Sequence, residues 1–227
     1  ERALRDTEKS HACNGCLKGK AKAPIKHRQP ERPTRVGEMI HCDIKTDLPT
    51  SYQDSKHFIH FTCDATRATW TYALRKKSDA VGAFLLFLAE ANSEGHHVRK
   101  IRCDNDSVLI AGNMKGVLAE KNIKITTTAP HDKQAGGRHE RIIDTLWSHV
   151  MAVHHSNPNI PIKYWPLTLQ FVTLVYNALV HSTTGKIPYA QWTGRTPDIS
   201  YLRAYGSQVY AYVPKQLRKS TQPRSES

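Results

Sequence analysis

Runs of apolar and β-branched residues divide the chain into segments that predict β-strands. From residue 38 onward, short stretches rich in isoleucine, phenylalanine, threonine and cysteine are separated by polar residues, which is typical of strands. The predicted strands are residues 38–43, 56–64, 66–74, 98–104 and 123–127, with a last one at 208–213. The first three follow one another without an intervening helix.

Elsewhere, apolar residues recur at helical spacing. Ser78 is a helix-capping residue type, and Val81, Phe84, Leu85 and Leu88 after it fit one helix face. Further helices are predicted at residues 113–121, 140–153 and 162–179, and the Gly and Pro residues between 185 and 197 predict irregular structure. This order of elements predicts an α/β fold with a five-stranded mixed sheet and helices on both faces.

The net charge predicts a polyanionic partner. The 227 residues carry a formal net charge of +13 with a sequence pI near 9.6. Residues 1–36 hold ten Lys/Arg against four Asp/Glu, and residues 215–227 hold four against one. Lys and Arg that neutralise phosphates give strong affinity for nucleic acid, so DNA or RNA is the expected partner. Basic ends that serve only solubility are the alternative.

Several other classes of protein are disfavoured. No stretch approaches the roughly 18 apolar residues of a membrane span, and the N-terminus is charged rather than signal-like. Five cysteines without framework spacing favour a reducing compartment over a secreted disulfide scaffold. Because the chain starts on Glu1 rather than methionine, we expect it to be a fragment of a longer protein.

Three acidic residues form the main candidate site. Asp43 and Asp104 each close a predicted strand, and Glu140 opens a predicted helix, with 35 residues between Asp104 and Glu140. Open α/β sheets bind ligands at strand ends. Carboxylates from separate elements can converge into an oxygen cage for two divalent cations, which supports in-line phosphoryl displacement. A chance triplet among 20 acidic residues is the alternative.

Neighbouring acids and cysteines need separate interpretations. Asp64 also follows a strand, but Arg67 is a nearby ion-pair partner, which favours a structural role. Asp106 could assist Asp104, and Asp144, one helical turn after Glu140, could be an outer-shell group. The residues directly before the three strand-end aspartates are Cys42, Cys63 and Cys103. The pleat puts each thiol on the face opposite its aspartate, so we expect them to be small core residues.

Motifs along nearly the whole chain together resemble the integrases of copia-type LTR retrotransposons, within the retroviral-integrase and RNase H-like superfamily. The segments that carry the resemblance are Cys13-Asn14-Gly15-Cys16 with Gly19-Lys20, His41-Cys42-Asp43, residues 64–70 (D-x-x-R-x-x-W), Arg102-Cys103-Asp104-Asn105, residues 127–130 with 137–141, residues 188–197 (P-x-x-x-W-x-G-x-x-P) and residues 202–206.

The resemblance implies a function and a site. Asp43, Asp104 and Glu140 would be the catalytic triad that holds two Mg²⁺ or Mn²⁺ ions. The enzyme would process the ends of the element's DNA and join their 3′-hydroxyls to target DNA. The resemblance also implies a homo-oligomer that acts on DNA in the nucleus after a cytoplasmic particle stage, without membrane association.

The resemblance also implies a domain organisation. The expected parts are a truncated zinc-binding segment and basic linker at residues 1–36, the catalytic core at 37–184, and the start of a C-terminal extension at 185–227. Cys13 and Cys16 have the spacing of half a zinc site, but four ligands are needed. They are either half of a truncated site or bind no metal in this chain.

The chain departs from the family pattern near the expected site. Asp106 and Gly136 replace the usual Gly and Asn, bulky His139 precedes Glu140, and Asp144 replaces an Arg. These changes leave the expected ligands intact but allow a second hypothesis, a catalytically weakened DNA-binding or assembly protein with the same fold. A third hypothesis, an RNase H-like nuclease acting on RNA–DNA hybrids, is disfavoured by the signature at residues 192–197.

Basic residues in a dense tract before residue 30 and others that flank the expected site are candidate DNA contacts. They are Lys18, Lys20, Lys22, Lys26, Arg28, Lys133, Arg138 and Arg141. For those before residue 30, a solvated linker is the alternative. Two histidine pairs, at 96–97 and 154–155, lie among polar residues and are expected at the surface. Trp165 and Tyr176 are expected in the core or in a subunit contact.

Overall fold

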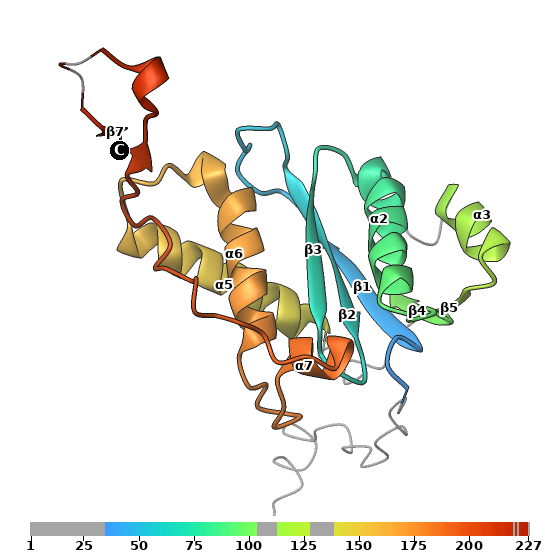
Figure 1. Cartoon of the computed structure of the whole chain (residues 1–227). Coiled ribbons are helices and arrows are strands. Elements are labelled where there is room, and N and C mark those ends of the chain that lie inside the picture. The colour runs from blue at the N-terminus through green and yellow to red at the C-terminus, as the bar shows by residue number, and fades with distance from the viewer. Residues whose placement is uncertain (1–34, 104–112, 128–138, 220, 222, 227) are drawn as a thin grey trace, which may run out of the picture. The chain divides into compact units, whose positions relative to one another are not determined.

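The computed structural model of the chain describes residues 35–103, 113–127, 139–219, 221 and 223–226, all within the unit Pro33–Ser227. Its centre is a five-stranded sheet in the order β3-β2-β1-β4-β5 (Figure 1). The strands are β1 (Met39–Lys45), β2 (His57–Cys63), β3 (Thr69–Leu74), β4 (Lys100–Cys103) and β5 (Lys124–Thr127). β1, β2 and β3 pair antiparallel, whereas β1, β4 and β5 run parallel. The predicted mixed sheet is therefore confirmed.

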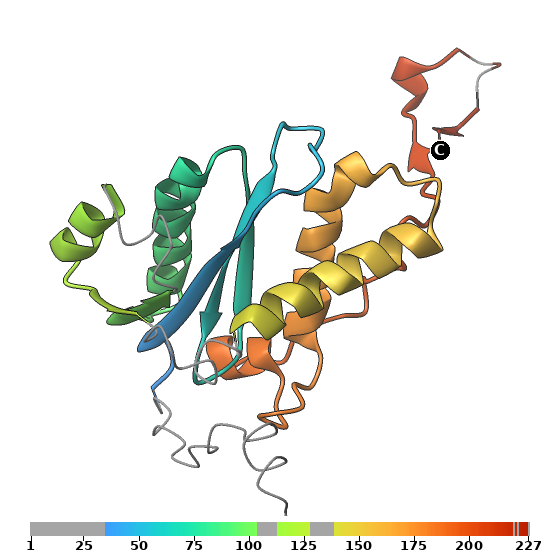
Figure 2. The ribbon, with the colours of Figure 1, turned by 180° about the vertical axis from the view of Figure 1, so that it is seen from behind.

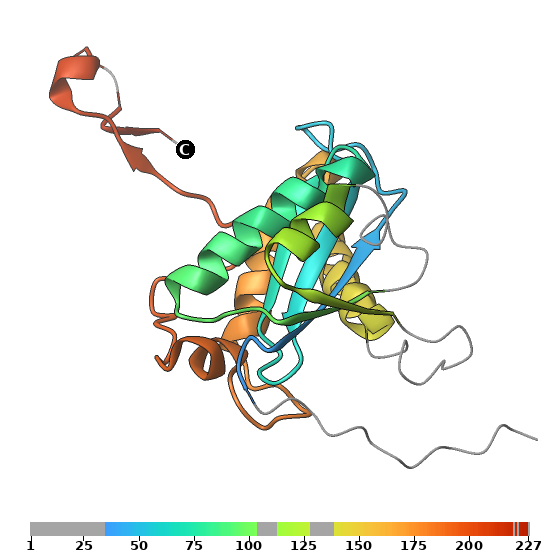
Figure 3. The ribbon, with the colours of Figure 1, turned by 90° about the vertical axis from the view of Figure 1, so that its right-hand side faces the viewer.

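Helices cover both faces of the sheet, as predicted. α2 (Ala80–Ser93) and α3 (Asn113–Glu120) lie on one face, and α5 (His139–Ser156) and α6 (Trp165–Ala178) lie on the other (Figures 1 to 3). The shorter elements are the 3-10 turns η1 (Lys77–Asp79), η2 (Ile162–Tyr164) and η3 (Lys215–Leu217), helix α7 (Pro188–Thr193), and the strands β6 (Ala211–Tyr212) and β7 (Ser225–Glu226). No helix in the described part of the chain is long and apolar enough to cross a membrane.

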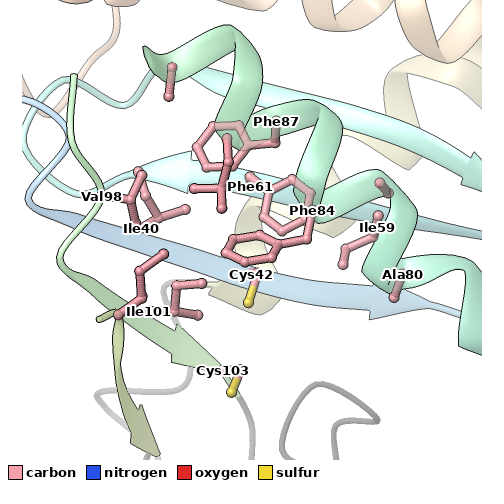
Figure 4. Packing of buried hydrophobic residues seen from close by; sticks show 14 of the residues in the cluster. Ile40, Cys42, Ile59, Phe61, Ala80, Phe84, Phe87, Val98, Ile101 and Cys103 are labelled. Atoms are coloured by element: carbon pink, nitrogen blue, oxygen red, sulfur yellow. The ribbon is translucent and has the colours of Figure 1, made fainter. Parts of the chain in front are cut away.

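The core under α2 is built from alternate residues of the central strands. Phe61 of β2 stacks on Phe87 of α2 with ring centroids 4.8 Å apart, and Ile40 lies in the same layer (Figure 4). The thiols of Cys42, Cys63 and Cys103 belong to this cluster and are at most 2% exposed. Burial raises the pKa of the Cys42 thiol well above its usual range. The prediction that these cysteines are core residues is confirmed.

The second core lies between the sheet and the α5–α6 pair. Phe58 of β2 packs near Trp147 of α5 and Trp165 of α6, with ring centroids 6.4 and 6.3 Å away. Trp165 is fully buried, and its indole Nε1–H donates to the Pro49 carbonyl at 2.7 Å. Trp165 is thus a core residue, one of the two roles expected for it. This layer fixes α5 over the sheet.

Several predictions for individual residues and boundaries were wrong. β1 continues past Asp43 to Lys45, because Ile44 and Lys45 still pair with β2. His154 is buried rather than at the surface, and its ring contacts the Thr168 hydroxyl at 3.0 Å and the Ile160 carbonyl at 3.2 Å. Leu85 was expected on the buried face of its helix, but it is 42% exposed.

The segment expected to be irregular contains helix α7. Pro188 occupies its first turn, and Gly194 ends it in the left-handed conformation with φ of 71°. Trp192 of α7 is buried against Trp70 of β3, with ring centroids 4.5 Å apart, and against the ring of His96 at 4.2 Å. His96 is therefore half-buried rather than a surface group. Proline at the start and glycine after the end are ordinary helix boundary signals.

Candidate functional site

Asp43 lies on the face of β1 that α5 covers. Side chains alternate along a strand, so Asp43 shares its face with His41 and Lys45, opposite the buried Cys42. The Asp43 carboxylate is half-buried, and its Oδ1 accepts the backbone N–H of Ile44 at 2.8 Å. An acceptor bonded to the backbone N–H has a restricted rotamer, which orients the carboxylate on this face.

Parallel pairing brings the end of β4 beside Asp43. The register sets Met39 opposite Lys100 and His41 opposite Arg102, and the Cys42 thiol reaches the Arg102 carbonyl at 3.8 Å. β4 ends at Cys103, the residue directly before Asp104 in the sequence. Asp104 itself lies outside the described residues.

The first turn of α5 contains Glu140. The helix begins at His139, and α5 packs on β1. The side chains of His139, Glu140 and Arg141 lie outside the described part of the structure, so only their place on the helix is known. The structure thus brings the helix with Glu140 onto the strand with Asp43, and leaves the distance between their carboxylates open.

Lys45 connects these two elements. Its Nζ lies 3.1 Å from Oδ1 of Asp144, and the two side chains are 24% and 69% exposed. Lys45 is two residues after Asp43 on the same strand face, and position 144 is one helical turn after position 140 on the same helix face. Asp144, predicted as an outer-shell group, is thus paired with a lysine of β1.

Asp64 forms a buried ion pair, as its structural interpretation predicted. Its Oδ1 lies 3.1 Å from Nη1 of Arg67 and 3.1 Å from Nε2 of His41. Arg67 adopts φ of 67°, in the left-handed region, at the turn between β2 and β3. Burial lowers the pKa of His41, and the Asp64 carboxylate offsets part of that effect. This cluster anchors the start of β1 to the β2–β3 turn.

His60 is a buried residue that the sequence interpretation missed. It is directly opposite Asp43 in the β1–β2 register, is fully buried, and its Nδ1 contacts the Thr62 hydroxyl at 3.1 Å. Burial, with a contribution from His41, lowers the pKa of His60 to about 3. The available signal was its same-face position across from Asp43, which becomes visible only once the strand register is known.

We expect His60 to make the fold sensitive to acid. The folded chain keeps His60 neutral, so the unfolded chain binds one more proton between its ordinary pKa of 6.5 and the folded value of about 3. The contribution of His60 to stability is complete above that upper value. It is lost as the pH falls through this window, by up to about 1.4 kcal/mol per pH unit.

Urea unfolding at about pH 7 and about pH 5 measures this effect. A His60→Gln variant should lose less stability between the two pH values than the unsubstituted chain, whereas His97→Gln, at an exposed histidine, should behave like the unsubstituted chain. An equal loss in all three proteins would show that His60 does not titrate in this window.

The remaining predicted site residues lie outside the described part of the chain. They are Cys13, Cys16, Lys18, Lys20, Lys22, Lys26, Arg28, Asp104, Asp106, Lys133, Gly136 and Arg138. Within the described residues, no group of three His, Cys, Asp or Glu side chains is placed to hold a metal ion. Of the three predicted metal ligands, Asp43 is the one whose side chain lies within the described residues.

A groove of about 310 Å³ runs along the free edge of β3, between α2 and α6. Trp70, Trp192 and Tyr189 line it together with Glu90 and Leu174. Asn177 of α6 covers one end of the strand edge, with its side-chain amide bonded to both the N–H and the carbonyl of Thr69 at 2.9 and 2.7 Å.

Comparison with known proteins gives relatives for both sequence and fold. No protein-family model matches the chain. The retrovirus-related Pol polyprotein from transposon TNT 1-94 of Nicotiana tabacum is 24% identical over 94% of this chain, and those from transposons RE1 and RE2 of Arabidopsis thaliana are 24% and 22% identical over 92% and 98%. The chain spans only 14–16% of the length of these relatives.

Solved structures share the fold. A chain of the simian T-cell lymphotropic virus intasome, in complex with PP2A regulatory subunit B56 gamma, matches with a TM-score of 0.61 at 18% identity, over 95% of this chain and 75% of that chain. The HTLV-2 integrase catalytic core domain in complex with magnesium, in its trimeric form, matches with a TM-score of 0.52 at 16% identity, over 67% and 94%.

The sheet order and the helices on both faces define an RNase H-like fold of the kind found in integrase catalytic cores. Its sequence relatives are Pol polyproteins of copia-type retrotransposons, and its fold is similar to that of retroviral integrase cores. The resemblance inferred from the sequence motifs is confirmed.

Proposed function

We propose that this chain contains the catalytic core of a retrotransposon integrase, which processes element DNA ends and joins their 3′-hydroxyls to target DNA. The observation that supports this most is that three elements, β1, β4 and α5, which hold or lead into the three acidic positions, meet in one region of the sheet. β1 holds Asp43, β4 ends directly before Asp104, and α5, which contains Glu140, packs on β1. The similarity to retroviral integrases supports a catalytic role for these three acids.

The donor set fits divalent cations. Asp43 is a half-buried carboxylate on a strand face, and Asp104 and Glu140 are also hard oxygen donors, the ligand type that Mg²⁺ and Mn²⁺ prefer. We propose that these three residues hold two such ions. When bound, the pair of ions would supply an activated hydroxyl nucleophile and stabilise the leaving oxygen. Magnesium is present in the HTLV-2 core structure.

The protein's own residues would position the substrate for this step. The β1 backbone fixes Asp43 through the sheet and through the Ile44 N–H bond. Arg141 on α5, with Lys133 and Arg138 before it in the sequence, would bind phosphates near the reacting bond. Phosphoryl transfer leaves little covalent chemistry for the protein to do, so positioning and charge stabilisation supply most of the rate enhancement in this class of chemistry.

Further DNA contacts and a zinc site are proposed for the basic N-terminal residues. Lys18, Lys20, Lys22, Lys26 and Arg28 would bind the DNA backbone electrostatically, with an affinity that falls as salt rises. Cys13 and Cys16 would supply two of the four ligands of a structural zinc site. We propose the nucleus as the site of function, because the target DNA would be chromosomal.

We propose that the chain acts as a homo-oligomer. Exposed leucines lie on the two helices beside the free β3 edge: Leu86 of α2 is 63% exposed, and Leu167 and Leu174 of α6 are 41% and 39% exposed. Exposed apolar side chains next to an unpaired strand edge are typical of association surfaces. Sedimentation velocity with and without DNA ends measures this association.

Strand transfer tests the proposed function directly. With an oligonucleotide that carries the element's terminal sequence, the chain should join 3′-ends to a second DNA in Mg²⁺ or Mn²⁺, and should not do so in a chelator. Asp104→Asn should reduce the joined product by about 10³-fold or more. A matched control is Asp54→Asn, at an exposed aspartate with φ of 63°, a conformation that asparagine tolerates well.

The same assay separates the rival hypotheses. Binding of DNA ends without any joining, in either metal, would contradict the enzyme assignment and leave an assembly protein. Cleavage of an RNA–DNA hybrid without strand transfer would instead indicate a nuclease.

A further inference from the structure

The Lys45–Asp144 pair is the described ion pair between the two elements that hold Asp43 and Glu140. Its Nζ–Oδ1 distance is 3.1 Å, and it joins residues 99 positions apart in the sequence. Lys45 is two residues along β1 from Asp43, which is about 6.6 Å at the usual strand rise, on the same face. The Lys45 ammonium is therefore close to the proposed metal site.

The pair contributes little to overall stability, so its role must be local. Asp144 is 69% exposed and Lys45 is 24% exposed, and exposed pairs of this kind contribute about 0–1 kcal/mol. Loss of the pair leaves both cores intact, because neither side chain belongs to them. Its removal therefore changes charge and alignment rather than folding.

The two partners have opposite effects on a cation site. An unpaired Asp144 carboxylate adds a negative charge one helical turn from position 140. An unpaired Lys45 ammonium adds a positive charge beside Asp43, where it can pair with the carboxylates that would otherwise bind metal. While the two side chains are paired, their opposite charges largely cancel, so the pair has little net electrostatic effect at the metal site.

We infer that Lys45 and Asp144 are positioning residues whose ion pair sets the charge of the metal site and aligns α5 on β1. This inference rests on the proposed function, since it presupposes that Asp43 and Glu140 hold the cations. In it, Asp144 holds the Lys45 ammonium away from Asp43, and Lys45 prevents Asp144 from acting as a fourth acidic ligand. A lysine from the strand thus compensates for the acidic residue at helix position 144.

Titration of Mn²⁺ into the chain, followed by calorimetry, tests the inference without reference to activity. Lys45→Met should tighten Mn²⁺ binding and Asp144→Asn should weaken it, each by about three- to tenfold at low salt. The reversed pair, Lys45→Glu with Asp144→Lys, should bind Mn²⁺ within about twofold of the unsubstituted chain. Both single effects should shrink at about 1 M salt, because exposed charges are then screened.

A matched control is the pair formed by Lys121 and Glu120, which has the same 3.1 Å length and is also exposed. It lies at the end of α3, on the opposite face of the sheet. Lys121→Met and Glu120→Gln should leave Mn²⁺ affinity unchanged.

Each result distinguishes this inference from the proposed function. Opposite shifts with recovery in the reversed pair support the inference. If both single variants shift the Mn²⁺ affinity in the same direction, the contact is merely structural and the inference is overturned. The inference is also overturned if neither variant changes the affinity. The proposed function stays intact in both cases. Absence of Mn²⁺ binding in the unsubstituted chain would overturn both.

Discussion

Asp43→Asn is expected to abolish strand transfer while leaving the fold intact. Asparagine keeps the size of the side chain and an oxygen that can accept the Ile44 N–H, but it removes the charge that would hold divalent cations. We expect a loss of about 10³-fold or more in joined product. Without metal, the thermal unfolding midpoint should not fall, since Asp43 is partly exposed and forms no part of either core.

Metal-dependent stabilisation gives an independent measure of the same substitution. A ligand that binds only the folded state raises stability in proportion to RT ln(1 + [L]/Kd). Mn²⁺ should therefore raise the unfolding midpoint of the unsubstituted chain and of Asp54→Asn, but not that of Asp43→Asn. Full activity in Asp43→Asn would remove this residue from the proposed site.

The second large effect concerns the buried ion pair. Asp64→Ala should lower the free energy of unfolding by about 3–5 kcal/mol, because the buried Arg67 guanidinium would lose the Asp64 carboxylate. Asp64 and Arg67 are only 7% and 5% exposed. Urea denaturation measures the loss. The double variant Asp64→Ala/Arg67→Ala should be less destabilised than the sum of the two single variants, since both buried charges are then absent.

The Arg195–Glu94 pair provides the control for this effect. It has a similar length, 3.0 Å, but its arginine is 67% exposed. Glu94→Ala should cost no more than about 1 kcal/mol. A loss of similar size at both pairs would mean that burial does not determine the value of the Asp64 contact.

The sequence predicted the sheet and its helices because their signals are local. Alternation and helical spacing identify elements such as β2 and α5, and the order of elements limits the possible sheets. Asp43 was found in the same way, from an apolar run that ends in an acid. The predicted end of β1 was wrong because Ile44 and Lys45 belong to the strand through their pairing with β2. The sequence of one segment does not show which strand it pairs with.

What the sequence missed depends on contacts between distant residues. His154 looks like a surface residue among its polar neighbours, and only the later Thr168 and the Ile160 carbonyl bury it. The Lys45–Asp144 pair links residues 99 positions apart. Helix α7 was hidden because Pro188 and Gly194 were taken as signs of irregular structure, although they occupy the ordinary boundary positions of a helix.

X-ray diffraction from crystals of the chain grown with Mn²⁺ shows whether Asp43, Asp104 and Glu140 hold the same metal ions. We expect anomalous peaks within coordination distance, about 2.1 Å, of carboxylate oxygens of Asp43, Asp104 and Glu140. Peaks at other residues, or a Glu140 carboxylate held by an ordered α5 more than about 10 Å from Asp43, far beyond such distances, would contradict this expectation.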